Sequence, residues 1–358
     1  YLFNELENID RNIIYALFKY KKDNNRLKKI SFNTAQKIDN LLKNIKIYDP
    51  AIGSGAFPVE LMNFIVNARL YLNLIIKNNR NTNYNLKRNF IEFSLFGNDI
   101  DGSATETAKL RLWLSLIIEE KDYEAITTLP NLDYKITIGD SLVSTKINLL
   151  NYQILDQITI LKNNYVGATN IRKKNKIKTE INKLYKEILL EDFFDIKTNF
   201  HEVFIEKGGF DIVLGNPPYF QIQKLSKTKY QNKLKKEEYA TYDGFGDIYC
   251  LFFERGFSLL NNVGVLCYIT SNKWLKTSYG EKLRKFFTNS NIIEKVIDFR
   301  QEAIFKTASV DTSIVLLSKI NKNINSFHGC LVKENLKNIS IEEYFLKNSV
   351  LLENLSSE

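Results

Sequence analysis

Apolar positions recur along this chain with two different periods. Over residues 1–44 they follow the spacing of amphipathic helices, which predicts a helical amino-terminal segment. Beyond it, short apolar runs alternate with longer amphipathic stretches. The short runs predict strands at 45–48, 90–96, 134–138, 210–214, 263–270, 292–299 and 313–317, the last being the final clear strand. The longer stretches predict helices at 59–76, 104–118 and 248–260, the third capped by Asp247.

The alternation of strand and helix predicts an α/β fold built on a mixed, mostly parallel sheet with helices on both faces. We expect this α/β domain to occupy residues 45–325, with an Asn-rich loop at 78–85 and a basic helical insertion at about 150–200. Residues 326–358 are polar and mixed, which indicates a linker or the start of another domain. Because the first residue is Tyr1 and not Met, we expect a fragment or a processed chain.

The composition excludes several protein classes. With 44% hydrophobic residues, 24 Phe and 19 Tyr, the chain can bury a large core, which excludes disordered and fibrous proteins. Three cysteines without paired spacing and two histidines support neither a disulfide framework nor a metal site. No apolar run looks long enough to cross a bilayer, so we expect no membrane partner and a cytoplasmic location. The net charge of +9 favours a polyanionic partner, although a genome biased toward Lys and Asn would give the same excess.

The first predicted strand runs directly into a glycine-rich turn at 49–57. Gly53 and Gly55 let the backbone turn tightly and approach a ligand, and the following helix offers amide donors at its first turn. The turn lacks the Gly-Lys-Ser/Thr of a phosphate-binding loop and the Gly-x-Gly-x-x-Gly of a dinucleotide site. It therefore indicates a ligand site of another kind, or a turn alone.

Carboxylates follow the next two predicted strands. Asp99 is suited to accept hydrogen bonds from both hydroxyls of a ribose, whereas Asp101 is better explained as a helix cap. Asp140, followed by Ser141, could hold the amino group of an adenine ring, or could be a solvated loop carboxylate. Since the carboxyl ends of parallel strands meet at one edge of a sheet, we expect these residues and the glycine turn to build one crevice.

The fourth predicted strand ends in Asn216-Pro217-Pro218-Tyr219. Two successive prolines remove two amide donors and fix the backbone, so that nearby carbonyl groups can point at a ligand. An aromatic ring follows immediately. Two hydrogen-bond acceptors beside a stacking surface suit an exocyclic amine on a planar ring; the alternative is a rigid turn that ends a strand.

The segments at 49–57, 97–101, 139–142 and 215–219 resemble motifs I, II, III and IV of the adenine-specific DNA amino-methyltransferases. Their order resembles that of the gamma class, and their amino-acid sequences are most similar to those of the fused type IIG restriction-modification enzymes. Segments that begin at Gly246, Gly264 and Phe305 resemble later motifs, so the resemblance covers residues 45–320. Two departures stand out: a tyrosine-containing motif that usually precedes motif I is not recognisable, and the insertion is long.

The resemblance implies a Rossmann-like class I fold that uses S-adenosyl-L-methionine (SAM) to methylate the 6-amino group of adenine. It implies that Asn216 and Pro217 accept the amine hydrogens and that Tyr219 and Phe305 stack on an extruded base. The implied catalytic residues are Asn216, Pro217, Pro218, Tyr219 and Phe305. The implied cofactor-binding residues are Asp49, Pro50, Ala51, Gly53, Gly55, Phe57, Asp99, Ile100, Asp140, Ser141 and Asn216.

The implied partners are double-stranded DNA, a target-recognition domain and, if the parent enzyme also cleaves DNA, a nuclease domain of the same polypeptide. The implied location is the bacterial cytoplasm, at the nucleoid. The lysine-rich loop at 224–236 could close over the DNA backbone or could be a solvated loop. Two other functions stay open: a glutamine or RNA amino-methyltransferase with the same Asn-Pro-Pro-Tyr motif, and a DNA-binding subunit without catalysis.

Overall fold

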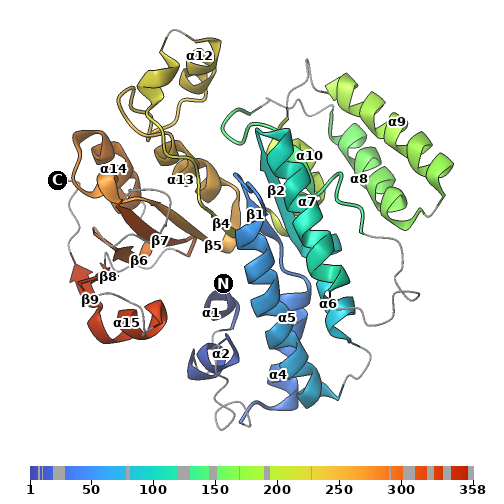
Figure 1. The fold of residues 1–358 in the computed structure, drawn as a ribbon, viewed down its shortest axis with the longest axis horizontal. Coiled ribbons are helices and arrows are strands. Elements are labelled where there is room, and N and C mark those ends of the chain that lie inside the picture. The colour runs from blue at the N-terminus through green and yellow to red at the C-terminus, as the bar shows by residue number, and fades with distance from the viewer. Residues whose placement is uncertain are drawn as a thin grey trace. The chain divides into compact units, whose positions relative to one another are not determined.

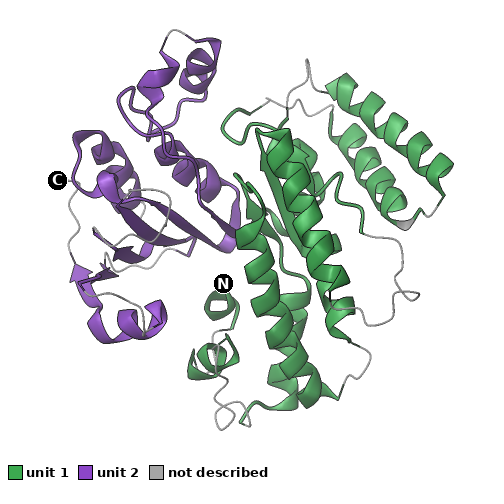
Figure 2. Ribbon diagram, in the orientation of Figure 1, with its two compact units in different colours: residues 1–210 green, residues 211–358 purple. Residues whose placement is uncertain are grey.

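The computed structural model describes residues 1–6, 9, 11–18, 29–77, 81–118, 130–144, 151–168, 170–188, 194–226, 228–289, 292–300, 311–320, 326–333 and 340–353. The chain forms two compact units, residues 1–210 and 211–358, which Figure 2 shows in separate colours. Each unit has its own strands and helices (Figure 1). The predicted domain limits at 44/45 and 325/326 stay a prediction.

The described residues of the first unit form three strands that lie entirely within it, in the order β3-β2-β1. These are β1 (Ile47–Asp49), β2 (Leu95–Asp99) and β3 (Ile136–Ile138), and each neighbouring pair is parallel. Its helices are α1 (Leu2–Glu5), α2 (Arg11–Phe18), α4 (Phe32–Lys43), α5 (Ala56–Ile76), α6 (Asn83–Asn89), α7 (Gly102–Ile117), α8 (Tyr152–Gly167), α9 (Ile171–Ile188), α10 (Ile196–Asn199) and α11 (His201–Lys207). The parallel strand-helix order confirms the α/β fold class for this unit.

Aromatic rings fill the core of the first unit beside β1 and β2. The ring of Tyr48 in β1 stacks on Phe210 with centroids 4.7 Å apart, and Phe96 in β2 meets Phe210 edge-to-face at 5.6 Å. Phe200 completes this cluster, and Tyr48, Phe96, Phe200 and Phe210 are all fully buried. Such packing holds the carboxyl ends of the strands in a fixed register, because a close-packed core tolerates little displacement.

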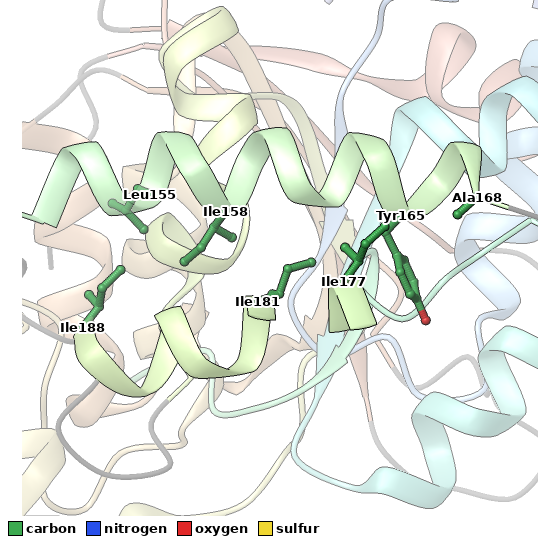
Figure 3. Close-up of a cluster of buried hydrophobic side chains, with 7 residues drawn as sticks. All are labelled: Leu155, Ile158, Tyr165, Ala168, Ile177, Ile181 and Ile188. Carbon is green, nitrogen blue, oxygen red and sulfur yellow. The ribbon is translucent and has the colours of Figure 1, made fainter. Parts of the chain in front are cut away.

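Helices α8 and α9 form the basic insertion and have an apolar cluster of their own. Figure 3 shows its side chains between the two helices: Leu155, Ile158, Tyr165, Ala168, Ile177, Ile181 and Ile188. A largely buried ion-pair network ties the pair to the rest of the unit, because Glu202 of α11 contacts both Lys162 of α8, at 3.3 Å, and Lys135, at 3.5 Å. Burial lowers the pKa of Lys135 to about 8, although the charge of Glu202 opposes the shift.

The second unit is a mixed sheet in the order β4-β5-β7-β6-β8-β9. Strand β7 runs antiparallel to both β5 and β6, while β6 and β8 are parallel and β8 and β9 antiparallel. The strands are β4 (Phe210–Gly215, whose first residue belongs to the first unit), β5 (Leu260–Ser271), β6 (Ile293–Asp298), β7 (Thr312–Ser318), β8 (Ser326–Leu331) and β9 (Val350–Glu353). The helices are α12 (Lys229–Lys236), α13 (Tyr249–Ser258), α14 (Glu281–Asn289) and α15 (Ile341–Asn348), with short 3-10 turns at Ile222–Leu225, Asn272–Leu275 and Ser278–Gly280.

Three predictions about local structure are wrong. Residues Phe90–Ser94 are not a strand but a π-helical turn that continues α6, and the strand proper is Leu95–Asp99. The predicted loop at 78–85 overlaps α6, which begins at Asn83 because the Thr82 side chain accepts from the amide of Asn85. The segment 313–317 does not hold the last strand, since β8 and β9 follow it.

The predictions for Asp247 and for apolar runs also need correction. Asp247 does not cap α13; Ile248 occupies the cap position, and the Asp247 carboxylate accepts a hydrogen bond from the Tyr279 hydroxyl at 2.8 Å. Helix α5 is long and apolar enough to span a bilayer by length and composition alone. A core helix passes the same test, and the α5 residues Met62, Ile65 and Leu72 are buried in the first unit.

Candidate functional site

The glycine turn after β1 has the tight backbone conformation that the sequence predicts. Gly53 and Gly55 have φ values of +52° and +74°, a region that favours glycine. Gly55 also lies close to α7, because a Cβ atom there would stand 3.1 Å from the Cβ of Ala108. The turn therefore requires glycine at position 55 for two reasons: backbone conformation and close helix packing.

Asp99, at the end of β2, bonds directly to the glycine turn. Its Oδ2 accepts from the amide of Gly53 at 2.9 Å, and its Oδ1 accepts from the amide of Asp101 at 3.0 Å. A carboxylate oxygen can accept more than one hydrogen bond, so these contacts leave capacity for a ligand hydroxyl. Asp101 caps α7 by accepting from Ser103, which confirms its prediction as a helix cap.

Asp49, at the end of β1, is almost completely buried, with 1% of its surface exposed. Its Oδ1 accepts from the amide of Ala51 at 3.1 Å. Burial raises the pKa of Asp49 to about 7; the bond from Ala51 opposes this shift, and the negative charge of Asp99 adds to it. Asp49 is therefore an acid that changes protonation near neutral pH and that a nearby cation would ionise.

A buried polar network, which the sequence did not reveal, joins the carboxyl ends of the three strands. Asn98 in β2 accepts from the Tyr48 hydroxyl, and its Nδ2 donates to the Gly139 carbonyl at 2.7 Å and to the Ser141 hydroxyl at 2.8 Å. Ser141 in turn donates to the Pro50 carbonyl at 2.5 Å. Buried polar groups that satisfy one another specify a unique arrangement, so Asn98 positions the candidate cofactor residues.

Ser141, like Asp49, is a predicted cofactor residue whose side chain is buried. It is 3% exposed, and its hydroxyl belongs to the Asn98 network. Asp140 beside it is half-buried and accepts from the amide of Leu142 at 2.9 Å. Its cofactor-binding role, like that of every predicted site residue, stays a prediction.

Two predicted cofactor residues expose large apolar side chains near these strand ends. Ile100, directly after Asp99, is 71% exposed, and Phe57 in the first turn of α5 is 42% exposed. Small-molecule sites combine apolar side chains with a few polar groups, so a planar ring could pack against these two side chains. Pro50 and Ala51 complete the turn between β1 and the two glycines.

In the second unit, Asn216 and Tyr219 form a hydrogen-bonded corner. The Tyr219 hydroxyl donates to the Asn216 Oδ1 and lies 3.1 Å from the carbonyl oxygen of Ile269. Pro217 is buried and Pro218 exposed, while Asn216 and Tyr219 are half-buried. Burial raises the pKa of the Tyr219 phenol above its usual range, so this hydroxyl stays protonated and donates.

The segment at 246–249, which resembles a later motif, packs against this corner. The amide of Ile222 donates to the Gly246 carbonyl at 2.8 Å, and the amide of Ile248 donates to the Phe220 carbonyl at 2.9 Å. The ring of Tyr249 meets Tyr219 edge-to-face at 6.0 Å. Behind it, the hydroxyls of Tyr249 and Tyr279 lie 3.3 Å apart. The backbone and the aromatic rings thus hold the corner from two sides.

Phe305, the predicted second stacking residue, lies outside the described residues. Within the first unit the structure brings together Asp49, Gly53, Asp99, Asp140 and Ser141, and within the second Asn216 and Tyr219. No group of His, Cys, Asp and Glu in the described part of the chain could hold a metal ion.

Comparison with known proteins identifies relatives over most of the chain. The chain is 28% identical over 358 residues to the type II restriction enzyme and methyltransferase RM.Eco57I of Escherichia coli, which covers 96% of this chain and 31% of that protein. It is 33% identical over 129 residues to the type II methyltransferase M.BstVI of Geobacillus stearothermophilus, covering 36% of this chain and 22% of that protein. The chain thus spans about a third, or less, of the length of these relatives.

A solved structure shares the fold. The ATP-dependent type ISP restriction-modification enzyme LlaBIII bound to DNA superposes with a TM-score of 0.51 at 13% identity, covering 89% of this chain and 21% of that one. The family model for the Eco57I restriction-modification methylase matches residues 94–305, which is more than half of the chain. The Rossmann-like α/β fold and SAM as the methyl donor, both implied by the resemblance, are confirmed. The chain belongs to the Eco57I restriction-modification methylase family.

Proposed function

We propose that this chain is the catalytic part of a restriction-modification enzyme and transfers the methyl group of SAM to the 6-amino group of adenine in double-stranded DNA. The family and the names of the relatives support a DNA methyltransferase. The choice of adenine rests on one observation, the Asn216–Tyr219 corner, in which a half-buried carboxamide oxygen stands beside an aromatic ring.

The first unit supplies the residues that would hold SAM. The backbone at Gly53 and Gly55, which carries no side chains, allows close approach of the methionine part of SAM. The Asp99 carboxylate fits the ribose hydroxyls. Asp49 would become ionised beside the positively charged methionine part of SAM. Asp140 would hold the amino group of the adenine ring of SAM. The exposed side chains of Phe57 and Ile100 fit the two faces of the adenine ring of SAM.

The reaction needs an activated amine, and the corner would provide it. The lone pair of the 6-amino nitrogen is delocalised into the ring, so the amine is a poor nucleophile while it stays planar. The Asn216 Oδ1 and the Pro217 carbonyl would accept its two hydrogens and draw the nitrogen toward tetrahedral geometry. Bound SAM would supply an electrophilic methyl carbon. The amine nitrogen would form a bond to this carbon as the carbon–sulfur bond breaks with its electron pair on sulfur, and the methylated amine would release one proton to water.

The Tyr219 hydroxyl has a defined part in this scheme. By donating to Asn216 Oδ1 it fixes which end of the carboxamide presents oxygen, and it leaves one lone pair of that oxygen for an amine hydrogen. Its neighbour Tyr249 holds the ring edge-to-face, so the Tyr219 ring keeps one orientation. We propose that the ring then stacks on the extruded adenine, which offsets part of the cost of leaving the duplex, about a few kcal/mol.

The whole enzyme would contain more than this chain. Since the chain spans 31% of RM.Eco57I, we place sequence recognition in a target-recognition domain, and DNA cleavage in a nuclease domain, of the same longer polypeptide. The lysines of α12, Lys229, Lys233, Lys235 and Lys236, would contact the DNA backbone beside the catalytic corner. The site of action would be the bacterial nucleoid.

A transfer assay tests the proposed function. The chain is incubated with methyl-labelled SAM and, separately, with duplex DNA, RNA or a Gly-Gly-Gln peptide, and labelled nucleosides are separated after digestion. We expect label in N6-methyladenine from DNA and at least about a hundredfold less after Asn216→Ala, while Asn163→Ala on the exposed face of α8 serves as a matched control. Label in the peptide or in RNA alone would replace DNA by that substrate, and equal activity of Asn216→Ala would remove the catalytic role of the corner.

A further inference from the structure

Helix α9 carries a stripe of positive charge along its solvent-facing side. Its eighteen residues include seven basic and two acidic side chains. Four of the basic ones follow one another at intervals of four, seven and three residues, which keeps them within about 80° on an α-helix. These four, named the α9 stripe, are Arg172, Lys176, Lys183 and Lys186, and all are exposed.

The stripe lies opposite the face by which α9 packs. Ile177, Ile181 and Ile188 point toward α8 in the apolar cluster of Figure 3. On the helical wheel the centre of these isoleucines stands about 155° from the centre of the stripe. The packing of α9 therefore needs none of the four stripe residues, and the same packing fixes the direction in which the stripe faces.

Two other basic residues of α9, Lys174 and Lys178, contact the rest of the first unit, whereas the stripe does not. Lys178 forms an ion pair with Asp133 at 3.1 Å, and Lys174 lies over the Tyr165 ring at 5.8 Å. Within the described part of the chain, no stripe residue has an ion pair or a hydrogen bond through its charged group. Their charges are therefore available to an external partner.

The concentration of one charge sign on α9 contrasts with α8. The charged residues of α8 are Asp156 and Lys162, and each has a partner inside the unit. Its exposed face is otherwise uncharged, so the hairpin does not need charge to face water. Arg172 and Lys176 are like charges four residues apart, which is unfavourable in a helix, whereas Glu180 and Glu187 offset Lys176 and Lys183 at the same spacing. The excess of positive charge on α9 therefore has no role that the packing of the hairpin requires.

We propose that the α9 stripe binds the phosphate backbone of double-stranded DNA without reading its sequence; this inference rests on the proposed function. The stripe runs along about 21 Å of helix at 1.5 Å per residue, a length of duplex that presents many phosphates. Glu180 and Glu187 flank it and reduce its charge. Long, flexible lysine side chains suit phosphate contacts that fix position and carry no base information.

Anisotropy titration of a labelled 30-base-pair duplex tests the stripe. The quadruple variant Arg172→Gln, Lys176→Gln, Lys183→Gln and Lys186→Gln should weaken duplex binding at least about tenfold at low salt. It should also reduce the slope of log affinity against log salt by about 1 for each lost contact. SAM affinity and the rate at saturating DNA should not change, because the substitutions lie on the insertion. The double variant Glu180→Gln, Glu187→Gln removes negative charge from the same helix and should tighten binding.

The outcomes separate this inference from the proposed function. Unchanged affinity and salt slope in the quadruple variant, or no tightening in the double variant, would overturn the stripe as a DNA-binding surface. A loss confined to RNA with duplex binding intact would overturn it as well, as would a wild-type chain that binds no duplex. A wild-type chain that binds DNA through the stripe but methylates no adenine would instead contradict the proposed function alone. Circular dichroism of both variants checks that α9 stays folded.

Discussion

The buried carboxyl group of Asp49 makes a quantitative prediction about pH. Its pKa is raised to about 7 in the folded chain, chiefly by burial, against 3.8 as the ordinary value. The folded state therefore binds more protons than the unfolded state between these two values, and the free energy of unfolding falls as pH rises through this window. Between pH 5 and pH 8 the loss that Asp49 causes is about 2.5 kcal/mol.

Asp49→Asn replaces the titratable carboxyl group by a carboxamide of the same size and shape. Its side-chain oxygen can still accept from the Ala51 amide, as Oδ1 of Asp49 does. Urea unfolding of both proteins at several pH values measures the result. Groups common to the two chains cancel in the difference, so the stability of the wild type relative to the variant should fall by about 2.5 kcal/mol from pH 5 to pH 8. A difference that does not change with pH would refute the raised pKa.

The same carboxyl group should control SAM binding. If only ionised Asp49 binds the positively charged methionine part, the dissociation constant of SAM should fall about tenfold for each unit of pH from 5 to 7 and level off above it. Calorimetry in two buffers with different ionisation enthalpies should detect proton release near pH 6. The Asn variant should bind weakly and without this pH dependence; a pH dependence equal to that of the wild type would contradict the assignment.

Three further substitutions test individual contacts. Tyr219→Phe removes the hydroxyl that donates to Asn216, so kcat should fall about tenfold while SAM affinity, measured by calorimetry, stays the same. Asn98→Ala breaks the buried network at the strand ends and should lower the free energy of unfolding by about 2–3 kcal/mol in urea titrations, and an effect near zero would contradict the network. Gly55→Ala places a Cβ at a φ of +74° and 3.1 Å from Ala108, so SAM affinity should fall at least about tenfold; unchanged affinity would show that the turn tolerates a side chain.

The candidate site could be predicted from the sequence where a motif requires a particular backbone. Gly53 and Gly55 were predictable because a glycine turn between a strand and a helix has few conformations, and the structure gives both a positive φ. Asp101 was predictable as a helix cap from its place before α7. Asn98 was not, because an asparagine beside Asp99 gives no signal of its burial; its role depends on Gly139 and Ser141, which are distant in the sequence.

The errors in the fold have a similar origin. Phe90–Ser94 has the apolar content of a buried strand, and a short apolar run does not distinguish a strand from a buried helical turn. Strand β8 alternates weakly in burial and β9 is exposed throughout, so backbone pairing defines them more than side-chain burial does. Pairing between β6 and β8 depends on chain segments that the local pattern cannot relate.

Quantifying methylated nucleosides in duplex DNA after reaction with SAM tests whether the Asn216 corner methylates the amine of adenine. We expect N6-methyladenine as the sole methylated base, formed by the wild-type chain and reduced at least about a hundredfold by Asn216→Ala. Methyl groups found on cytosine, or N6-methyladenine formed equally well without the Asn216 carboxamide, would contradict this mechanism.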